Sequence, residues 1–279
     1  MVLGRSTLAV ARLDLAEVLR SRWLLFCAAL YAGLAALFVL VGLRESSVLG
    51  FTGMGRVLLS LCHALVLLLP LLALTAVGQV VNHARDDGTL ELLFSHPVTR
   101  RQYFVAVTAV RFSMLVLPLA ALLLLVSLLG WLVLGSAVPW GFIGTACLVS
   151  ASLLWAFVGI GIGISTCVRN QAKAMIFLLL AWVTGVALLD FGLAGLMLQW
   201  RMSAATVFLL AALNPVEAAR VALLSGAEPS LSVLGPVGFF LANRLGGGWL
   251  FALGTLWPAL AGTIAWGLAL RRFSRGDLV

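Results

Sequence analysis

The sequence predicts an all-α polytopic membrane protein, in which one transmembrane domain of six transmembrane helices covers residues 1–279. Its mean hydropathy is +1.15 and only 10% of its residues are charged, which leaves too little polar side chain to cover a soluble domain. Six apolar runs each have about the 20 residues that a helix needs to cross hydrocarbon. These runs do not alternate in polarity, as the strands of a membrane barrel would.

The six predicted spans are approximately residues 23–43, 57–81, 112–134, 142–168, 174–198 and 249–270. With both termini on one side, 13 of the 18 Lys and Arg residues share that side, and this bias places the N- and C-termini in the cytoplasm. We therefore attribute the net charge of +8 to membrane topology and expect no nucleic-acid partner. The basic residues on the shared side are Arg5, Arg12, Arg20, Arg22, Arg85, Arg100, Arg101, Arg111, Arg169, Lys173, Arg271, Arg272 and Arg275.

Residues 6–22 are expected to form an amphipathic interfacial helix that lies on membrane lipid at the cytoplasmic surface. Leu8, Leu15 and Leu19 fall on one helical stripe, whereas Asp14 and Glu17 lie opposite. A solvated leader that carries only a topology signal is the alternative. The apolar run that follows is too long for the core of a cleaved signal peptide, so we expect it to stay in the chain.

Two rows of small residues predict close contacts between helices. In the first span, Ala28, Ala32 and Ala36 recur every four residues, which suits a dimer face and an internal helix contact equally well. In the fourth span, the sequence GIGIG covers residues 159–163. No strand precedes it, so it does not fit a phosphate-binding loop, and we expect it to pack closely against another helix.

Few residues inside the predicted spans could carry chemistry. Asp190 is the only carboxylate there, so it is a candidate to line a pathway or to pair with Arg201 or Arg244, unless it reaches interfacial water. Cys62 and His63 are adjacent and point about 100° apart on a helix, so we expect no metal site in this chain. No second histidine lies in a span, so we expect no bis-histidine haem site either. No nucleophile pairs with that histidine, so an enzyme is not expected.

The polar stretch at residues 84–103 is expected to form a cytoplasmic loop that holds a short helix. Asp86 or Asp87 can cap a helix that begins near Thr89. Its apolar face recurs at positions i, i+3 and i+4. The residues of this face are Leu90, Leu93 and Phe94.

A helix of two turns is unstable alone in water, so this one needs a surface to pack on. Lipid, the chain's own bundle or another subunit could provide that surface. The acidic start of the helix argues against anionic lipid, and a groove in a partner protein is favoured. After the helix, Thr99 and Gln102 have the spacing of a capping box that opens the third span.

Residues 199–248 are too polar to span and are expected to form short helices on the outer, periplasmic face, before the last span. In the segment NPVEAARVALLSG, Asn214 suits the N-cap, Pro215 the first helical position and Glu217 the third, while Gly226 ends the helix. An outer partner is expected to bind this region. The residues expected to contact it are Asn214, Pro215, Glu217, Arg220 and Arg244.

No ATP-binding loop is visible in the sequence. The only lysine, Lys173, follows VRNQA rather than a glycine-rich turn. We therefore expect no cofactor in this chain and expect a separate polypeptide to bind ATP and Mg.

The stretch ARDDGTLELLFSHPVTRRQYF at residues 84–104 closely resembles the first cytoplasmic loop of the ABC-2 type exporter permeases, whose pattern is roughly E-R-x-x-G-T-L-E-x-L-L-S-x-P-x-x-R. In that family the loop carries a coupling helix that docks in a cleft of an ATP-hydrolysing subunit. The resemblance implies a non-catalytic subunit that acts as a homodimer with a cytoplasmic ABC ATPase. The coupling residues that it implies are Arg85, Asp86, Asp87, Gly88, Thr89, Leu90, Glu91, Leu92, Leu93, Phe94, Ser95, Pro97 and Arg100.

Within that family, the segments NPVEAARVALLSG and LSVLGPVGFFLANRLG resemble those of the NosY-type permeases, which belong to the machinery that matures nitrous oxide reductase. This likeness implies a NosF-like ATPase, a periplasmic copper-handling NosD-like protein and a location in a bacterial inner membrane. An ABC-2 exporter of a lipid, drug or polysaccharide is one alternative. A mechanotransmitting scaffold that moves no substrate itself is another.

Overall fold

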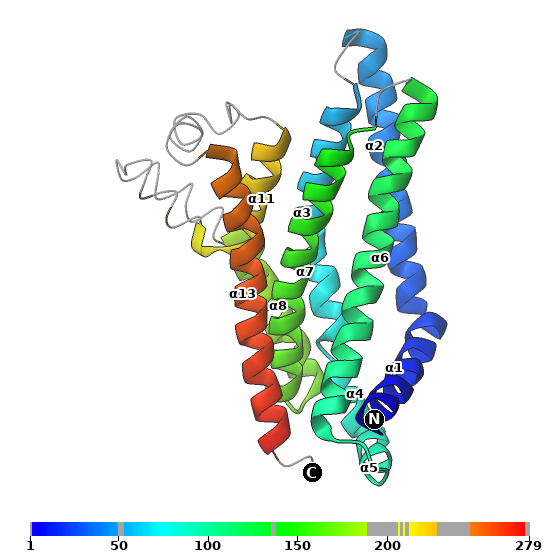
Figure 1. Cartoon of the computed structure of the whole chain (residues 1–279), viewed down its shortest axis with the longest axis vertical. Coiled ribbons are helices and arrows are strands. Elements are labelled where there is room, and N and C mark those ends of the chain that lie inside the picture. Colours follow the sequence, from blue (N-terminus) through cyan, green and yellow to red (C-terminus); the bar gives the residue numbers. More distant parts are fainter. Residues whose placement is uncertain are drawn as a thin grey trace.

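The structure, a computed structural model, describes residues 2–49, 53–134, 138–188, 206, 209, 212–227 and 246–276. These residues form helices joined by short turns, without a β-strand among them. Long helices run side by side through an elongated bundle (Figure 1). The predicted all-α class is therefore confirmed for this part of the chain.

The bundle begins with α1 (Val2–Arg20), α2 (Arg22–Leu49) and α3 (Gly53–Val77). The short helices α4 (Val80–Asp86) and α5 (Thr89–Phe94) follow, and then the long α6 (Arg100–Leu134) and α7 (Trp140–Cys167). The second half contains α8 (Gln171–Trp182), the π-helix η1 (Val183–Leu188), α11 (Pro215–Ala227) and α13 (Gly246–Arg275).

Four helices in the described ranges are long and apolar enough to cross a membrane: Ser60–Asp86, Arg100–Leu132, Trp140–Cys167 and Gly246–Arg275. Of two shorter apolar helical stretches, Leu25–Leu34 falls within the predicted first span, and Gln171–Ala187 begins before the predicted fifth span and overlaps it. A multi-pass membrane protein follows from the four long helices. The total of six spans stays a prediction, because part of the fifth predicted span, including Asp190, lies outside the described residues, as do Arg201 and Arg244.

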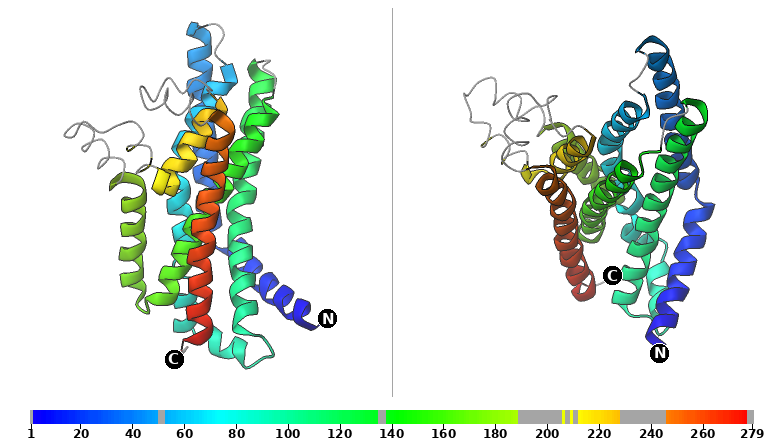
Figure 2. Two further views of the ribbon diagram at one scale, coloured as in Figure 1. Left: turned by 60° about the vertical axis from the view of Figure 1, so that its left-hand side comes forward. Right: turned by 45° about the horizontal axis from the view of Figure 1, so that its top comes forward.

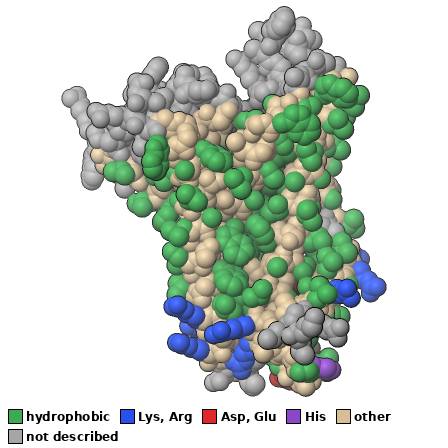
Figure 3. All heavy atoms as spheres, viewed as in Figure 1, with side chains coloured by type: hydrophobic (Ala, Val, Ile, Leu, Met, Phe, Trp, Pro, Cys, Tyr) green, Lys and Arg blue, Asp and Glu red, His purple; other side chains and the backbone are tan. Residues whose placement is uncertain are grey.

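The two ends of the bundle differ in what they contain. α1, α5 and the C-terminal end of α13 share one end, which we call the termini end, whereas α11 lies toward the other (Figures 1 and 2). Lys and Arg side chains gather around the termini end, below a band of hydrophobic side chains (Figure 3). This arrangement agrees with the prediction that the two termini lie on the same side. Their placement in the cytoplasm stays a prediction.

The glycine row of α7 packs closely, as the sequence predicted. A Cβ atom on Gly159 would collide with the backbone carbonyl of Gly262 in α13, and one on Gly161 would lie 2.8 Å from the side chain of Val77 in α3. These two glycines therefore allow α7 to approach its neighbours on both sides.

The alanine row of α2 has a different environment. Ala28, Ala32 and Ala36 are exposed and line an open apolar groove of about 560 Å³ between α2 and α6. The groove also contains Tyr31 and Pro118. Of the two contacts that the sequence allowed for this row, the internal one is therefore wrong within the described residues, and the dimer face stays a prediction.

Candidate functional site

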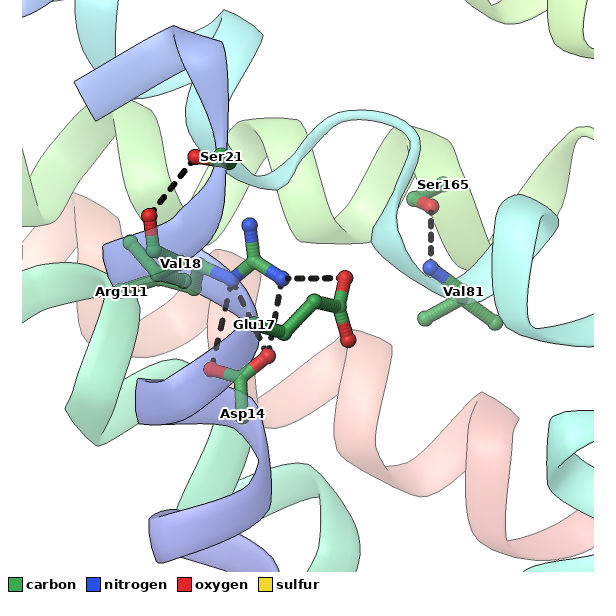
Figure 4. Close-up of polar contacts among 7 residues, drawn as sticks. All are labelled: Asp14, Glu17, Val18, Ser21, Val81, Arg111 and Ser165. Atoms are coloured by element: carbon green, nitrogen blue, oxygen red, sulfur yellow. Dashed lines mark hydrogen bonds and ion pairs between the residues drawn. The ribbon is translucent and has the colours of Figure 1, made fainter. Parts of the chain in front are cut away.

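The candidate site is the segment α4–α5 at the termini end, together with the helices that hold it. α4 is fastened to α7 and α8 by two hydrogen bonds. The Val81 backbone N–H donates to Ser165 Oγ of α7 at 3.1 Å (Figure 4), and Gln171 Nε2 of α8 donates to Asp86 Oδ2 at 2.7 Å. Because Val81 is buried and Asp86 is exposed, α4 is anchored both inside the bundle and at its surface.

The turn between α4 and α5 depends on glycine rather than on a side-chain cap. Gly88 has a φ of 69°, in the left-handed region that favours glycine, and occupies the N-cap position of α5. The prediction that Asp86 or Asp87 caps this helix is wrong. Asp86 bonds Gln171 instead, and Asp87 lies 3.1 Å from Nε2 of His83 within α4.

The predicted apolar face of α5 exists, but the chain's own bundle covers it. Leu90 is only 2% exposed, and Leu93 packs against the same core. The ring of Phe94 makes an edge contact with the ring of Tyr103 of α6, with 6.0 Å between the ring centroids. Its centroid lies 6.5 Å from that of Phe273 of α13. Leu90 and Phe94 are therefore held by the chain's own bundle, whereas Leu93 also lines an open cavity, and docking of this face in a partner's groove stays a prediction.

The opposite face of α5 points outward. Leu92 is 70% exposed, and Thr89 and Glu91 beside it are exposed as well. Ser95 ends the helix by donating its hydroxyl to the Leu92 carbonyl at 2.7 Å, and Pro97 follows, also exposed. This outward face is one apolar side chain among polar and acidic ones. It is the part of α5 that another protein can reach.

The entry into α6 confirms the predicted capping box. The Thr99 backbone N–H donates to Gln102 Oε1 at 2.8 Å, and the Gln102 N–H donates to Thr99 Oγ1 at 3.3 Å. Between them, Arg100 donates from Nη1 to the carbonyl of Gly276 at 2.6 Å. The segment after α5 is thus tied to the C-terminal end of α13.

A chain of aromatic rings continues from α5 into the middle of the bundle. Tyr103 stacks on Phe273 at 5.9 Å, and Phe273 lies 5.4 Å from Phe104. Phe104 then lies 5.8 Å from Trp266, and Trp266 lies 6.2 Å from Trp155 of α7. Sequence reasoning missed this chain. The available signal was the spacing of Trp266 and Phe273, which are seven residues apart and therefore share a helix face.

α1 is attached to the same end of the bundle by a buried ion pair. Arg111 of α6 donates from Nη2 to Asp14 Oδ1 at 2.8 Å and from Nε to both carboxylate oxygens at 3.2 and 3.3 Å, and it also reaches Glu17 at 3.4 Å (Figure 4). The Asp14 side chain is 8% exposed and that of Arg111 is 13% exposed. Burial raises the pKa of the Asp14 carboxyl above its ordinary value, although the Arg111 guanidinium lowers it.

Leu8 and Leu19 of this helix face away from the bundle, as contact with lipid requires, whereas the burial of Asp14 against α6 was not predicted. Val10, Asp14 and Val18 face α6, whereas Leu8 and Leu19 are 53% and 56% exposed. The helix also begins before residue 6 and ends at Arg20, where Ser21 separates it from α2. In a membrane protein, lipid can cover the leucines, so the acidic side chain can take the protein-facing side.

A cavity of about 500 Å³ lies between α1 and the α4–α5 segment. Asp14, Arg111 and Tyr103 contribute to its walls, and so do His83 and Leu93. The cavity therefore lies between α1 and α5. Its walls include residues of the α1–α6 ion pair and residues of the α4–α5 segment.

At the other end, α11 begins as the sequence predicted. Asn214 Oδ1 accepts from the Val216 N–H at 3.0 Å, and its Nδ2 donates to the Gly185 carbonyl of η1 at 2.7 Å. Asn214 is only 2% exposed, so it serves as a cap rather than as a contact for a partner. Glu217 pairs with Arg220 at 2.7 Å, and the helix continues past Gly226 to Ala227.

Histidine, cysteine and carboxylate side chains do not converge in the described part of the chain. No group of three or more of them that could hold a metal ion occurs there.

Comparison with known proteins agrees with this geometry. The family model described as ABC-2 family transporter protein matches residues 8–278. The chain is similar to the "Probable ABC transporter permease protein NosY" of Stutzerimonas stutzeri, with 30% identity over 236 residues that cover 81% of this chain and 84% of that protein. It is also similar to the protein of the same name from Pseudomonas aeruginosa strain PAO1, with 28% identity over 277 residues that cover 94% and 97%. Since the family model covers nearly all of its length, the chain belongs to the ABC-2 family of transporter proteins, as an ABC transporter permease.

Proposed function

We propose that this permease receives the motion of a separate ABC ATPase through the outward face of α5 and passes it to its membrane helices. The observation that carries the proposal is the two-sided build of α5. Leu90 is 2% exposed and fixed to the bundle, whereas Leu92, two residues later, is 70% exposed at the termini end. A short helix that is anchored on one side and open on the other suits the transfer of force between two proteins.

The outward face defines the expected docking contact. Leu92 supplies an apolar side chain for a pocket, and full burial of a leucine side chain contributes about 1.5–3 kcal/mol. Asp87 and Glu91 lie exposed near it. The ATPase should therefore present an apolar pocket with basic residues at its rim.

The inward contacts provide the route for the motion. Phe94 contacts rings of α6 and α13, and the ring chain leads on to Trp155 in α7. Asp86 and Val81 connect α4 to α8 and α7. A displacement of α5 would thus act on four helices at once, namely α6, α7, α8 and α13. ATP and Mg would be bound by the ATPase, and this chain would contribute position and movement only.

The biological role that we propose is the maturation of nitrous oxide reductase, with assembly of its copper site. It is supported by the name of the two relatives and by the resemblance of the 214–226 segment. The chain would then act as a homodimer in a bacterial inner membrane, with a NosF-like ATPase inside and a copper-handling NosD-like protein outside. The α11 end would face that outer protein.

A second candidate function is the export of an apolar compound such as a lipid. The groove between α2 and α6 favours it, because its walls are apolar apart from Tyr31 and it is open at the surface of the bundle. Transport into vesicles distinguishes this function from that of a scaffold that only transmits force.

The coupling role is tested by Leu92→Asp in the chain reconstituted with its ATPase. We expect a folded, inserted chain that binds the ATPase about thirtyfold more weakly and no longer stimulates ATP hydrolysis. Leu8→Asp on α1, at a leucine that is 53% exposed, is the matched control and should keep the stimulation. Normal stimulation by the Leu92→Asp chain would contradict the coupling role.

The maturation role is tested in a denitrifying culture that lacks this chain. We expect nitrous oxide to accumulate and the reductase to be deficient in copper. Normal consumption of the gas by a fully metallated reductase would reject this role and leave the coupling role standing.

A further inference from the structure

Three arginines lie near one another at the termini end. Arg85 is in α4, Arg169 lies between α7 and α8, and Arg272 is in the last turn of α13. The bonds from Val81 to Ser165 and from Asp86 to Gln171 hold α4 against α7 and α8, so Arg85 is fixed beside their junction. Burial and the charges of Arg169 and Arg272 act unfavourably on the Arg85 guanidinium, whereas the neighbouring Asp86 carboxylate acts favourably on it.

Polar atoms on this side of α4 lack partners. Arg85 Nε and Nη1 are buried and make no hydrogen bond, and the same holds for both amide atoms of Asn82, which is 0% exposed. Asn82 and Arg85 are three residues apart and so lie on one face of α4. Buried donors without acceptors are costly, and those of a guanidinium most of all. The arrangement suits a ligand that brings acceptor oxygens and negative charge.

The depth of the cluster in the membrane narrows the choice of ligand. Arg169 follows the end of α7 at Cys167 by two residues, and Arg272 follows Leu270, the end of the last apolar run, by two. Both therefore lie just past the ends of their apolar segments, at the depth of the headgroup layer.

The neighbouring α8 makes this depth accessible to lipid. Its residues Ile176 and Leu180 are 66% and 59% exposed, one helical turn apart. Lys173, in its first turn, is exposed and adds a further positive charge. Acyl chains can therefore lie along α8 while their headgroup reaches the arginines.

We propose that Arg85, Arg169 and Arg272 form a binding site for the headgroup phosphate of an anionic phospholipid. A guanidinium group can donate two parallel hydrogen bonds to the oxygens of one phosphate. Basic pockets between membrane helices bind anionic headgroups. A bound headgroup connects α4, the α7–α8 junction and α13. The proposal does not depend on the ATPase, so the coupling role and the lipid site can fail separately.

The test uses the purified full-length chain in detergent, with lipid retention followed by native mass spectrometry. We expect phosphatidylglycerol to be retained by the wild type and phosphatidylcholine to be lost at the same concentration. Arg272→Gln and Arg85→Gln should each weaken phosphatidylglycerol binding about fivefold, since one basic side chain near a lipid surface contributes about 1 kcal/mol. Arg101→Gln, at an exposed arginine of α6 at the same end, is the control and should bind as the wild type does.

Two results would overturn the proposal. One is equal retention of phosphatidylglycerol by the wild type and the Arg272→Gln chain. The other is that inorganic phosphate stabilises the chain against heat as much as phosphatidylglycerol does at the same concentration. The site would then hold a free anion rather than a lipid. Arg272 is exposed, so its variant should fold even where the Arg85→Gln chain does not.

Discussion

α1 and α5 are both attached to the termini end of the same bundle, and they are attached by opposite means. α1 depends on the charge pair between Asp14 and Arg111, in a contact whose apolar part is Val10 and Val18. α5 depends on apolar and aromatic contacts, with Leu90 and Phe94 inside and its acidic residue Glu91 outside.

The difference determines how each contact responds to substitution and to displacement of the helix. A buried charge pair is costly to break, because the partner that remains has lost both water and its counterion. An apolar contact loses energy in proportion to the atoms removed and tolerates small adjustments. α1 should therefore be sensitive to single charges, whereas α5 can be displaced as a unit without such a penalty, as a coupling element requires.

The largest effect is expected from Arg111→Leu. This change leaves the Asp14 carboxylate buried without its counterion, and we expect a loss of about 3–5 kcal/mol in the free energy of unfolding. Denaturant titration in detergent, followed by tryptophan fluorescence, measures it. Adding Asp14→Asn to this variant should restore most of the loss. A double variant as unstable as the single one would show that the charge pair is not what holds α1.

Leu90→Ala should have the next largest effect. The residue is 2% exposed, so its truncation leaves a cavity and costs about 2–5 kcal/mol. Leu92→Ala on the same helix, at a residue that is 70% exposed, should cost less than about 0.5 kcal/mol in the free chain. Equal losses in the two variants, measured by the same titration, would mean that α5 does not have an inward and an outward face.

Gly88→Ala should cost about 1–2 kcal/mol, because a Cβ atom is unfavourable at a φ of 69°. Beyond the adjacent residues, no atom lies within 4 Å of the position that this Cβ would take, so the penalty comes from the local backbone conformation and not from tertiary packing. Gly88→Asn is the control and should lose less, since asparagine tolerates this region. A larger loss with asparagine than with alanine would contradict the role given to the turn.

The smallest effect concerns pH and α1. Because burial raises the pKa of Asp14 above 3.8, the folded state holds this proton more tightly than the unfolded state does. The stability of the wild type, relative to Asp14→Asn, should therefore rise as the pH falls from neutral toward that ordinary value. Unfolding midpoints of the two chains between pH 7 and pH 4 measure the difference. A relative fall would show that attraction to Arg111 exceeds the effect of burial.

Sequence patterns predicted the faces and caps of these helices better than they predicted which surfaces cover those faces. The periodicity of Leu90, Leu93 and Phe94 predicted a real helix face, and Thr99 with Gln102 predicted a real capping box. The identity of the covering surface could not be read from them, because an apolar face fits the chain's own bundle as well as a second protein. Phe273, which contacts Phe94, is distant in sequence.

The contact of α1 with α6 could not be predicted from amphipathicity alone. The leucine stripe indicated the side that lipid can cover. It did not indicate that Asp14 is buried, because the counterion Arg111 is 97 residues away in sequence. The two rows of small residues show the same limit: Gly159 packs on Gly262, whereas Ala32, on an equally regular row, stays exposed.

The proposed role of α5 is tested most directly by photo-crosslinking from its outward face. A photoreactive phenylalanine analogue placed at Leu92, and in a second chain at Leu8 of α1, compares two exposed leucines at the same end of the bundle. In membranes that contain the ABC ATPase, we expect a crosslink to the ATPase from position 92 and crosslinks to lipid alone from position 8. A crosslink to the ATPase from position 8 and none from position 92 would contradict the account, because the ATPase would then bind α1 and leave α5 free.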